Sequence, residues 1–346
     1  MSVTRRDLFK IAGAAGVGAM ISVPGLARAA KLEKTGVHIA VGGKALVYYL
    51  PLTIAEQLGY FKSEGLDAKI SDFAGGSKAL EAVVGGSADV CSGAFEHTIL
   101  LQAKQQFFST FVLQGRAPMI VFCASKKMGY KSPADFKGKK IGVTAPGSST
   151  SMLVSFFLAK HGLKSSDVSF IGVGAGAGAI SALRNGQIDA ICNVDPVIST
   201  LETSGDVEVV VDTRTLKDTH EVFGGNMPAG CLYASLDFLK ANPNTAQALA
   251  NAIVRADKWI QKASVDEIAK TVPAAYLLGQ PDVYKASLKK SMEGLSPDGL
   301  VPPDGPKTSL AAQAAYLPHF DASKIDLSKI WTNAYAERAN QKYPNG

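Results

Sequence analysis

The chain has 346 residues, 47% of them hydrophobic and 19% charged, which is ordinary composition for a folded protein and excludes a disordered one. A chain of this length exceeds what one hydrophobic core usually organises, so we expect two lobes. The net charge of +6 falls to +3 over residues 30–346, which hold 32 basic and 29 acidic side chains. Such a weak and evenly spread charge excludes a nucleic-acid-binding surface.

Residues 1–29 have the features of an export signal. Arg5 and Arg6 precede an apolar run over residues 11–23, and Ala27-Arg28-Ala29 places small residues at the two positions that a signal peptidase reads. The run is too short to span about 30 Å of hydrocarbon. Because an arginine pair ahead of such a run is typical of twin-arginine export, we expect a cleaved leader and a periplasmic protein. A retained membrane anchor is the alternative.

The four cysteines lie far apart, each within an apolar run. No CxxC pair and no Cys/His spacing suggests a metal site, so we expect buried free thiols. A twin-arginine substrate also folds first in the reducing cytoplasm, which argues further against disulfides. The residues are Cys91, Cys123, Cys192 and Cys231.

Strands and helices alternate from Val37 onward, which predicts β-α-β units and a parallel sheet. Each predicted strand ends in a glycine-containing turn before its helix, and ligands of such sheets bind at these carboxyl ends. The predicted strands of this first series are residues 37–42, 67–73 and 89–92, and the predicted helices are residues 50–58, 78–84 and 96–105.

A second β-α series opens at residues 132–136, after two further strands at 108–113 and 119–124. One more strand, residues 231–234, follows this series. We expect the chain to cross between lobes near Ala124-Ser125 and near Ala229-Gly230, through two antiparallel strands that form a hinge. The second series is predicted to contain strands at 140–143, 168–172 and 188–192, with helices at 152–158 and 179–184.

After Ala234 the pattern becomes almost wholly helical. These helices are too few and too polar to form a core of their own, so we expect them to pack on the first lobe. The predicted fold is therefore α/β, with lobe I formed by residues 30–124 and 231–346 and lobe II by residues 125–230. The predicted C-terminal helices are residues 245–263, 265–272, 281–292, 308–317 and 326–341.

The stretch 138–158 contains the first candidate binding site. A strand leads into the turn at residues 145–151, which is rich in hydroxyl groups and opens a buried helix. A helix N-terminus presents unpaired N–H groups and about half a positive charge, so Ser148, Ser149 and Thr150 there would suit a carboxylate, sulfonate or phosphate-like oxygen. Plain helix capping is the alternative. No lysine follows Gly147 in Walker spacing, which argues against a nucleotide P-loop.

Two aromatic or acidic clusters follow predicted strands. Tyr48 and Tyr49 in the first turn are suited to an apolar slot with polar tips, or to ordinary core packing. Glu96 and His97 suggest acid–base chemistry, but no nucleophile is near them in sequence, so we interpret Glu96 as a helix cap. Arg116 would either bind an anion through both guanidinium nitrogens or lie in solvent.

Other motifs are weaker. Residues 172–178 have GxGxG spacing rather than GxGxxG, so close backbone approach to a ligand or helix is favoured over a dinucleotide site. Asp195 before Pro196 is explained by a helix start, while Asn193 could face the cleft. No GxSxG, HExxH, paired-cysteine or triad order appears, so no hydrolase or metalloenzyme is indicated.

Five stretches together identify a resemblance that covers most of the chain after the leader. They resemble the periplasmic solute-binding proteins of the nitrate/sulfonate/taurine class of ABC importers. The resemblance implies a type II periplasmic binding protein of two lobes, each a mostly parallel sheet flanked by helices, which closes on a small and usually anionic solute. The stretches are residues 54–70 (IAEQLGYFKSEGLDAKI), 75–90 (GGSKALEAVVGGSADV), 138–143 (GKKIGV) with its GSS turn, 182–190 (ALRNGQIDA) and 325–339 (IDLSKIWTNAYAERA).

The resemblance also implies a set of ligand contacts by position. To these the sequence itself adds Tyr48 and Thr150. Val194 stands where many sulfonate-type members have tryptophan, which argues against an alkylsulfonate, and the cysteine-rich motif of the thiamine-pyrimidine-precursor branch is absent. The contacts implied are Gly43, Lys44, Ala45, Gly76, Ser77, Ala94, Phe95, Gly147, Ser148, Ser149, Asn193 and Asp195.

Two function classes follow from the resemblance. The first is a monomeric, non-enzymatic protein without cofactor, which captures a carboxylate or sulfonate solute and hands it to a membrane permease and its ATPase. The second is an enzyme on the same fold, such as a menaquinone-pathway lyase or a pyrimidine-precursor synthase. The leader favours the first class, since those enzymes work in the cytoplasm. The sequence does not name the solute.

Overall fold

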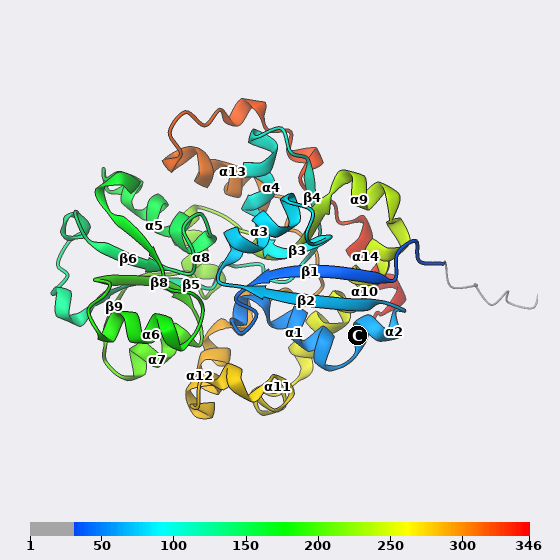
Figure 1. The fold of residues 1–346 in the computed structure, drawn as a ribbon, viewed down its shortest axis with the longest axis horizontal. Coiled ribbons are helices and arrows are strands. Elements are labelled where there is room, and N and C mark those ends of the chain that lie inside the picture. The colour runs from blue at the N-terminus through cyan, green and yellow to red at the C-terminus, as the bar shows by residue number, and fades with distance from the viewer. Residues whose placement is uncertain (1–30) are drawn as a thin grey trace, which may run out of the picture. The chain divides into compact units, whose positions relative to one another are not determined.

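Two five-stranded sheets organise residues 31–346, the part of the chain that the computed structural model describes (Figure 1). The first sheet has the order β2-β1-β3-β10-β4, and the second has the order β7-β6-β8-β5-β9. The predicted leader, with Arg5 and Arg6, lies outside the described residues. Within the described residues, no helix is long and apolar enough to cross a membrane.

The two sheets repeat one topology. In the first sheet β1 runs parallel to β2 and β3, while β10 runs antiparallel to its neighbours β3 and β4. In the second sheet β6 runs parallel to β7 and β8, while β5 runs antiparallel to β8 and β9. Each sheet is therefore mixed, with four strands in one direction and one antiparallel to them. The predicted α/β two-lobe fold is confirmed. The strands are β1 (Gly36–Gly42), β2 (Asp67–Phe73), β3 (Val90–Ala94), β4 (Phe108–Leu113), β5 (Ile120–Ser125), β6 (Lys140–Val143), β7 (Ser169–Gly172), β8 (Ala190–Val194), β9 (Val207–Asp212) and β10 (Gly230–Ser235).

The chain leaves the first sheet earlier than the sequence suggested. The strand expected at 119–124 in the first lobe is β5 of the second sheet, so the crossing runs through residues 114–119 rather than near Ala124. The return runs through residues 213–229 and ends at β10, close to the predicted Ala229-Gly230. Every residue of β5 is buried, so its own pattern fits either sheet, and only its pairing with β8 and β9 decides.

Helices cover both faces of each sheet (Figure 1). One face of the first sheet carries α3 and α4, and the other carries α1, α10 and α14; α5 covers one face of the second sheet, and α6 and α7 the other. The helices are α1 (Leu50–Gln57), α2 (Tyr60–Ser63), α3 (Gly76–Val84), α4 (Glu96–Ala103), α5 (Ser149–Lys160), α6 (Ala177–Arg184), α7 (Val197–Thr203), α8 (Leu216–Phe223), α9 (Leu236–Ala241), α10 (Pro243–Lys262), α11 (Val265–Thr271), α12 (Pro281–Ser291), α13 (Gly305–Tyr316) and α14 (Ala334–Lys342). Short 3-10 helices are η2 (Val47–Tyr49), η3 (Lys126–Met128), η4 (Pro133–Phe136), η5 (Ser165–Asp167), η6 (Ala274–Leu277), η7 (Met292–Gly294), η8 (Ala322–Lys324) and η9 (Leu327–Lys329).

Local sequence explains the best-predicted helices. In α10 the buried residues Leu249, Ile253, Ala256 and Ile260 recur every three or four positions, which gives the helix one apolar face for the first lobe. Pro243 occupies its first turn, where no N–H is needed.

The predicted helix at 326–341 is wrong in its first half. The Asp326 side chain accepts the N–H of Ser328 and closes a short turn, and Trp331 forms a β-bridge with Thr110. Both contacts hold the backbone out of a helix, so α14 begins only at Ala334.

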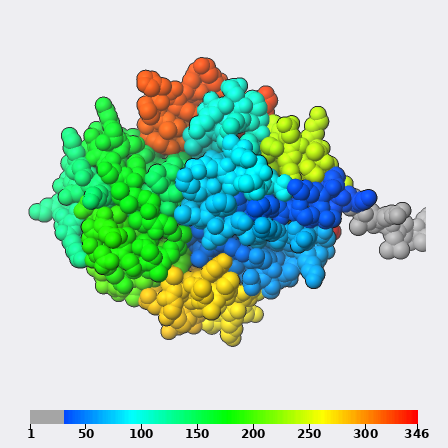
Figure 2. Space-filling model, in the orientation of Figure 1, coloured from blue at the N-terminus to red at the C-terminus, as the bar shows by residue number. Residues whose placement is uncertain are grey.

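The C-terminal helices do not all pack on the first lobe, as the sequence had suggested. α10 and α14 do, but α12 packs on α7 of the second lobe, and α13 contacts both α4 and α5. Figure 2 shows the α12 and α13 segments at opposite ends of the junction between the lobes. The C-terminal segment thus spans the junction.

All four cysteines are buried and free, as predicted. Burial raises the pKa of each thiol, to about 12 for Cys91. They therefore pack as small apolar side chains within the two sheets.

A buried ion cluster ties α12 to the second sheet. Arg214 is 5% exposed and donates to Glu202 at 2.9 and 3.0 Å and, through Nε, to Asp212 at 2.9 Å. Its Nη1 lies 3.4 Å from the fully buried Asp195, which also accepts from Ser291 of α12 at 3.3 Å. Burial alone would lower the pKa of Arg214, but these carboxylates raise it.

We expect Arg214→Met to lower the free energy of unfolding by about 3–5 kcal/mol, because it leaves Asp195 buried without its cation. Arg184→Met is the matched control, since Arg184 pairs with Asp206 in a solvent-exposed position of the same lobe. That change should cost no more than about 1 kcal/mol. Denaturant titrations of both variants measure the difference, and equal losses would contradict a buried-charge role.

Candidate ligand-binding site

Two adjoining cavities lie between the lobes and share the residues Tyr48, Ile120 and Ser149. The larger, which we call the Glu96 cavity, spans about 360 Å³ of space between atoms, part of it open to solvent, and the smaller, the Ser148 cavity, about 280 Å³. In this closed arrangement each leaves only about 20 Å³ of room for water-sized molecules. Besides the three shared residues, the lining of the Glu96 cavity consists of Glu96, Pro118, Met152, Leu153, Phe156, Phe223, Met227, Pro228, Ala229, Ala312 and Tyr316. The Ser148 cavity is also lined by Gly42, Leu46, Tyr49, Gly76, Thr144, Ser148, Thr150 and Val194.

The lining comes from the carboxyl ends of parallel strands in both sheets. Tyr48 lies in η2 after β1, Glu96 is the first residue of α4 after β3, and Ser148 precedes α5 after β6. This is the edge at which open α/β sheets bind ligands. The cavities therefore lie at the edge where the sequence predicted a ligand site.

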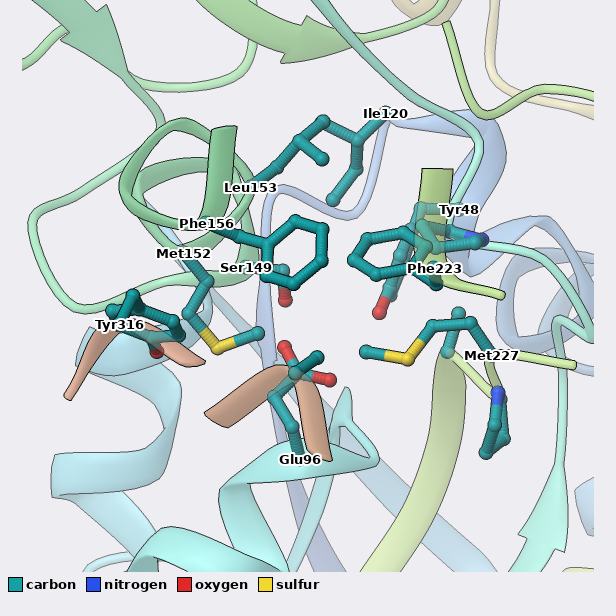
Figure 3. Close-up of a pocket in the computed structure, with 14 residues that line it drawn as sticks. Tyr48, Glu96, Ile120, Ser149, Met152, Leu153, Phe156, Phe223, Met227 and Tyr316 are labelled. Carbon is teal, nitrogen blue, oxygen red and sulfur yellow. The ribbon is translucent and has the colours of Figure 1, made fainter. Parts of the chain in front are cut away.

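Glu96 is the acidic side chain that lines the larger cavity. It is 2% exposed, and its Oε1 has no hydrogen-bond partner. Figure 3 shows its carboxylate directed into the same space as the hydroxyls of Ser149 and Tyr48. Burial raises the pKa of Glu96 to about 7, and the Ser149 hydroxyl and the residue's own N–H partly oppose that shift.

The wall around this carboxylate is apolar. Met152 and Phe156 lie one turn apart on α5, and the Phe223 ring packs on that of Phe156 with centroids 5.0 Å apart. Figure 3 shows Met227 across the cavity from Met152. Tyr316 of α13 closes another side. A carboxylate thus stands within a wall of aromatic rings and thioethers, where it is poorly solvated.

The Ser148 cavity contains the turn predicted from the sequence, but much of that turn's hydrogen-bonding capacity is used within the protein. The Ser77 N–H donates to the Ser148 hydroxyl at 2.9 Å, across the lobe junction. The Thr144 N–H donates to the Thr150 hydroxyl at 3.1 Å, and the Gly147 N–H donates to the Ser151 hydroxyl at 2.9 Å.

His97 lies behind Gly76 of this cavity. Its Nδ1 is 3.1 Å from the Tyr233 hydroxyl, and its Nε2 has no hydrogen-bond partner. Burial lowers the pKa of His97 to about 4, so the ring is neutral at pH 7. A Cβ on Gly76 would stand 3.4 Å from the His97 ring, so this glycine keeps the backbone close to the imidazole.

No lysine or arginine lines either cavity in the described part of the chain. Arg116 lies elsewhere, with its Nε donating to the Glu293 carbonyl at 2.9 Å, and Lys44 forms an ion pair with Glu56. An anionic solute, as the sequence predicted, would therefore meet helix N-termini but no basic side chain. Residues 31–346 also hold no group of His, Cys, Asp or Glu that could bind a metal ion.

The structure brings only part of the predicted site set to the cavities. Tyr48, Gly76, Ser148, Ser149 and Thr150 line them. The predicted residues outside both linings are Gly43, Lys44, Ala45, Ser77, Ala94, Phe95, Gly147, Asn193 and Asp195.

Internal contacts account for several residues of the second group. The Asp72 carboxylate accepts the N–H groups of Gly43 and Lys44 at 2.8 and 2.9 Å. The Asn193 amide donates to the Gly174 carbonyl at 3.0 Å, and Asp195 belongs to the Arg214 cluster. These groups organise the turns behind the cavities.

Sequence reasoning missed most of the larger cavity. Glu96 was interpreted as a cap, and it does lie in the first turn of α4, yet its carboxylate lines the cavity. An acid directly after a buried strand at the ligand-binding edge was the available signal. Met152 and Phe156 looked like core residues of a helix, and nothing local connects Phe223 or Tyr316 to the site.

The close contact between the lobes depends on the absence of a side chain at Gly75, not on an unusual backbone conformation there. A Cβ on Gly75 would lie 2.8 Å from the Ala145 Cβ and 2.9 Å from its N, across the junction. We expect Gly75→Ala to hold the lobes further apart and to increase the radius of gyration in small-angle scattering. Gly178→Ala, in α6, is the control, because its new Cβ would make only ordinary contact at 3.8 Å. Identical profiles for the two variants would contradict this role of Gly75.

Comparisons with known proteins agree with this architecture. The sequence model of the NMT1/THI5-like family matches residues 47–264. A solved structure from Bordetella bronchiseptica RB50 is 74% identical, with a TM-score of 0.91 over 91% of this chain and 100% of that one. The alkanesulfonate-binding protein SsuA from Xanthomonas axonopodis pv. citri, bound to MOPS, shares the fold at 20% identity and a TM-score of 0.67, over 87% of this chain and 99% of its own.

Of two curated relatives, one is named as a binding protein and the other as an enzyme. YtlA of Bacillus subtilis (strain 168), whose name is that of a binding protein, is 25% identical over 84% of this chain and 86% of its own length. The 4-amino-5-hydroxymethyl-2-methylpyrimidine phosphate synthase of Schizosaccharomyces pombe is 27% identical over only 42% of this chain and 41% of its own.

Proposed function

Because the chain belongs to the NMT1/THI5-like family, we propose that it is the extracytoplasmic solute-binding component of an ABC importer. The family match and the fold shared with SsuA bear out the resemblance to nitrate/sulfonate/taurine-class proteins. The observation that carries the proposal is the pair of cavities between two lobes, lined from both. A small organic solute bound there would be released to a permease and its ATPase, with the protein acting as a monomer.

Capture would proceed by closure of the lobes on the solute. The Ser77–Ser148 hydrogen bond and the close approach of Gly75 to Ala145 belong to a closed arrangement. Residues 114–119 and 213–229 are the two connections between the sheets of lobe I and lobe II, and they would form the hinge. The solute would shift an equilibrium between open and closed forms by binding the closed form more tightly.

The first turn of α5 would receive a hydrogen-bond acceptor of the solute. Ser149 lines both cavities, and the first N–H groups of α5 have no carbonyl one turn earlier in the helix. The family resemblance favours a carboxylate or sulfonate, but the lining offers it no cation. The charge of the whole solute is therefore a separate question from this contact.

An enzyme of the synthase type is the second candidate, supported by the S. pombe relative. Coverage favours capture over it. YtlA matches over 84% of this chain and 86% of its own, whereas the synthases of S. pombe and Aspergillus parasiticus match over 42% and 68% of this chain.

The test is to identify and rebind the natural solute. Protein purified under native conditions is mildly denatured, and the released small molecules are identified by mass spectrometry. We expect one solute, recovered unchanged after long incubation with fresh protein and rebound in calorimetry. Gly75→Ala should weaken rebinding by about one to two orders of magnitude if it destabilises the closed form by 1–3 kcal/mol, while Gly178→Ala should not. Chemical conversion of the solute would overturn the proposal in favour of an enzyme.

Export by the twin-arginine route is proposed from the leader alone. Changing both Arg5 and Arg6 to lysine should leave full-length precursor in the cytoplasm, since that route reads the arginine pair. Cell fractionation with immunoblotting measures this, and a Lys10→Arg precursor serves as the control. Normal processing of the double variant would show that another export route is used.

A further inference from the structure

We propose that the solute carries a protonated amine attached to an apolar body, and that this amine binds Glu96. The proposal deepens the proposed function and rests on it, because it assigns a chemical class to the solute of the same cavity. It differs from the anionic class that the resemblance implied.

The geometry requires a hydrogen-bond donor at one place. Glu96 Oε1 is buried, has no partner in the protein, and belongs to a carboxylate directed into the cavity (Figure 3). The Ser149 hydroxyl faces the same space and lowers the pKa of this carboxylate (Figure 3). Glu96 Oε1 already lacks both a partner and contact with solvent, which is costly in an apolar site, and a hydrogen-bond donor on the solute would relieve that cost.

The surrounding side chains favour a positive charge. A second negative charge beside Glu96 would be repelled, and no lysine or arginine of the described residues lines the cavity to offset it. Phe156, Phe223 and Tyr316 place aromatic rings around the same space. Aromatic rings attract an ammonium group, and thioethers such as those of Met152 and Met227 adapt to apolar bodies of varied shape.

The titratable groups that face Glu96 strengthen this assignment. Tyr48 and Tyr49 follow β1, Tyr316 comes from α13, Cys231 from β10, and His97 is its neighbour on α4. Burial raises the pKa of the tyrosines and of the thiol, and lowers that of His97, so all are neutral at pH 7. Glu96 is thus the group whose charge changes near neutral pH.

The pH dependence separates an amine from an acid. Burial raises the pKa of Glu96 to about 7, and an ammonium binds only its ionised form. Affinity for an amine should therefore rise about tenfold for each unit of pH below 7 and level off above it. An acidic solute would need protonated Glu96, so its affinity would fall as the pH rises.

The experiment uses 3-phenylpropylamine, 3-phenylpropanoate and 3-phenylpropanol as probes that share one body and differ in charge. Calorimetry on the solute-free protein should show binding of the amine in preference to the other two. Glu96→Gln, which keeps the size of the side chain, should weaken amine binding at least tenfold. Glu81→Gln, an exposed position on α3, should leave it unchanged.

Each outcome of these measurements supports or overturns the amine proposal. Preference for the carboxylate, tighter binding at low pH, or unchanged amine binding in Glu96→Gln would overturn the proposal. The pH series on the unsubstituted protein decides the question even if Glu96→Gln does not fold. A natural solute that rebinds in calorimetry but contains no amine would overturn this inference while the proposed transport function stands. A solute that is chemically converted would overturn that function instead.

Discussion

The parallel strands of both sheets end at the junction between the lobes, and the whole site depends on how closely those two edges approach. There the Ser77 N–H, in the first turn of α3, donates to the hydroxyl of Ser148 at the start of α5. Gly75 permits this contact, because a Cβ at that position would overlap Ala145. The cavities are the space that remains between the two edges, so neither lobe alone defines a site.

Where the signal was local, the fold could be predicted from the sequence. The apolar spacing of α10 and the glycine-ended strands of each β-α unit depend on neighbours in the chain. The sheet to which β5 belongs cannot be predicted from its neighbours in the chain, because six buried residues in a row suit the centre of either sheet. Its place follows from hydrogen bonds to β8 and β9, which lie far along the chain.

The residues of the candidate site also fall into those that could be predicted from local sequence and those that could not. Ser148, Ser149 and Thr150 could be predicted because hydroxyl groups at a helix start have a local meaning. The role of Glu96 could not, since an acid in the first turn of a helix is ordinary when exposed. It becomes unusual only when α5, α13 and the segment around Met227 cover it. That burial is a property of the tertiary fold, so capping was a complete explanation at the level of sequence.

Three buried acids show why the Glu96 carboxylate points to a ligand. Asp195 is fully buried, but Arg214 provides a cation within the protein. Asp257 on α10 has neither oxygen paired, and burial raises its pKa well above the usual range, so it is held neutral and borders neither cavity. Glu96 lies between these cases, since it borders a cavity and its pKa is near 7. A carboxyl group in that state can be driven to its ionised form by a cation, and the cavity is where such a cation would enter.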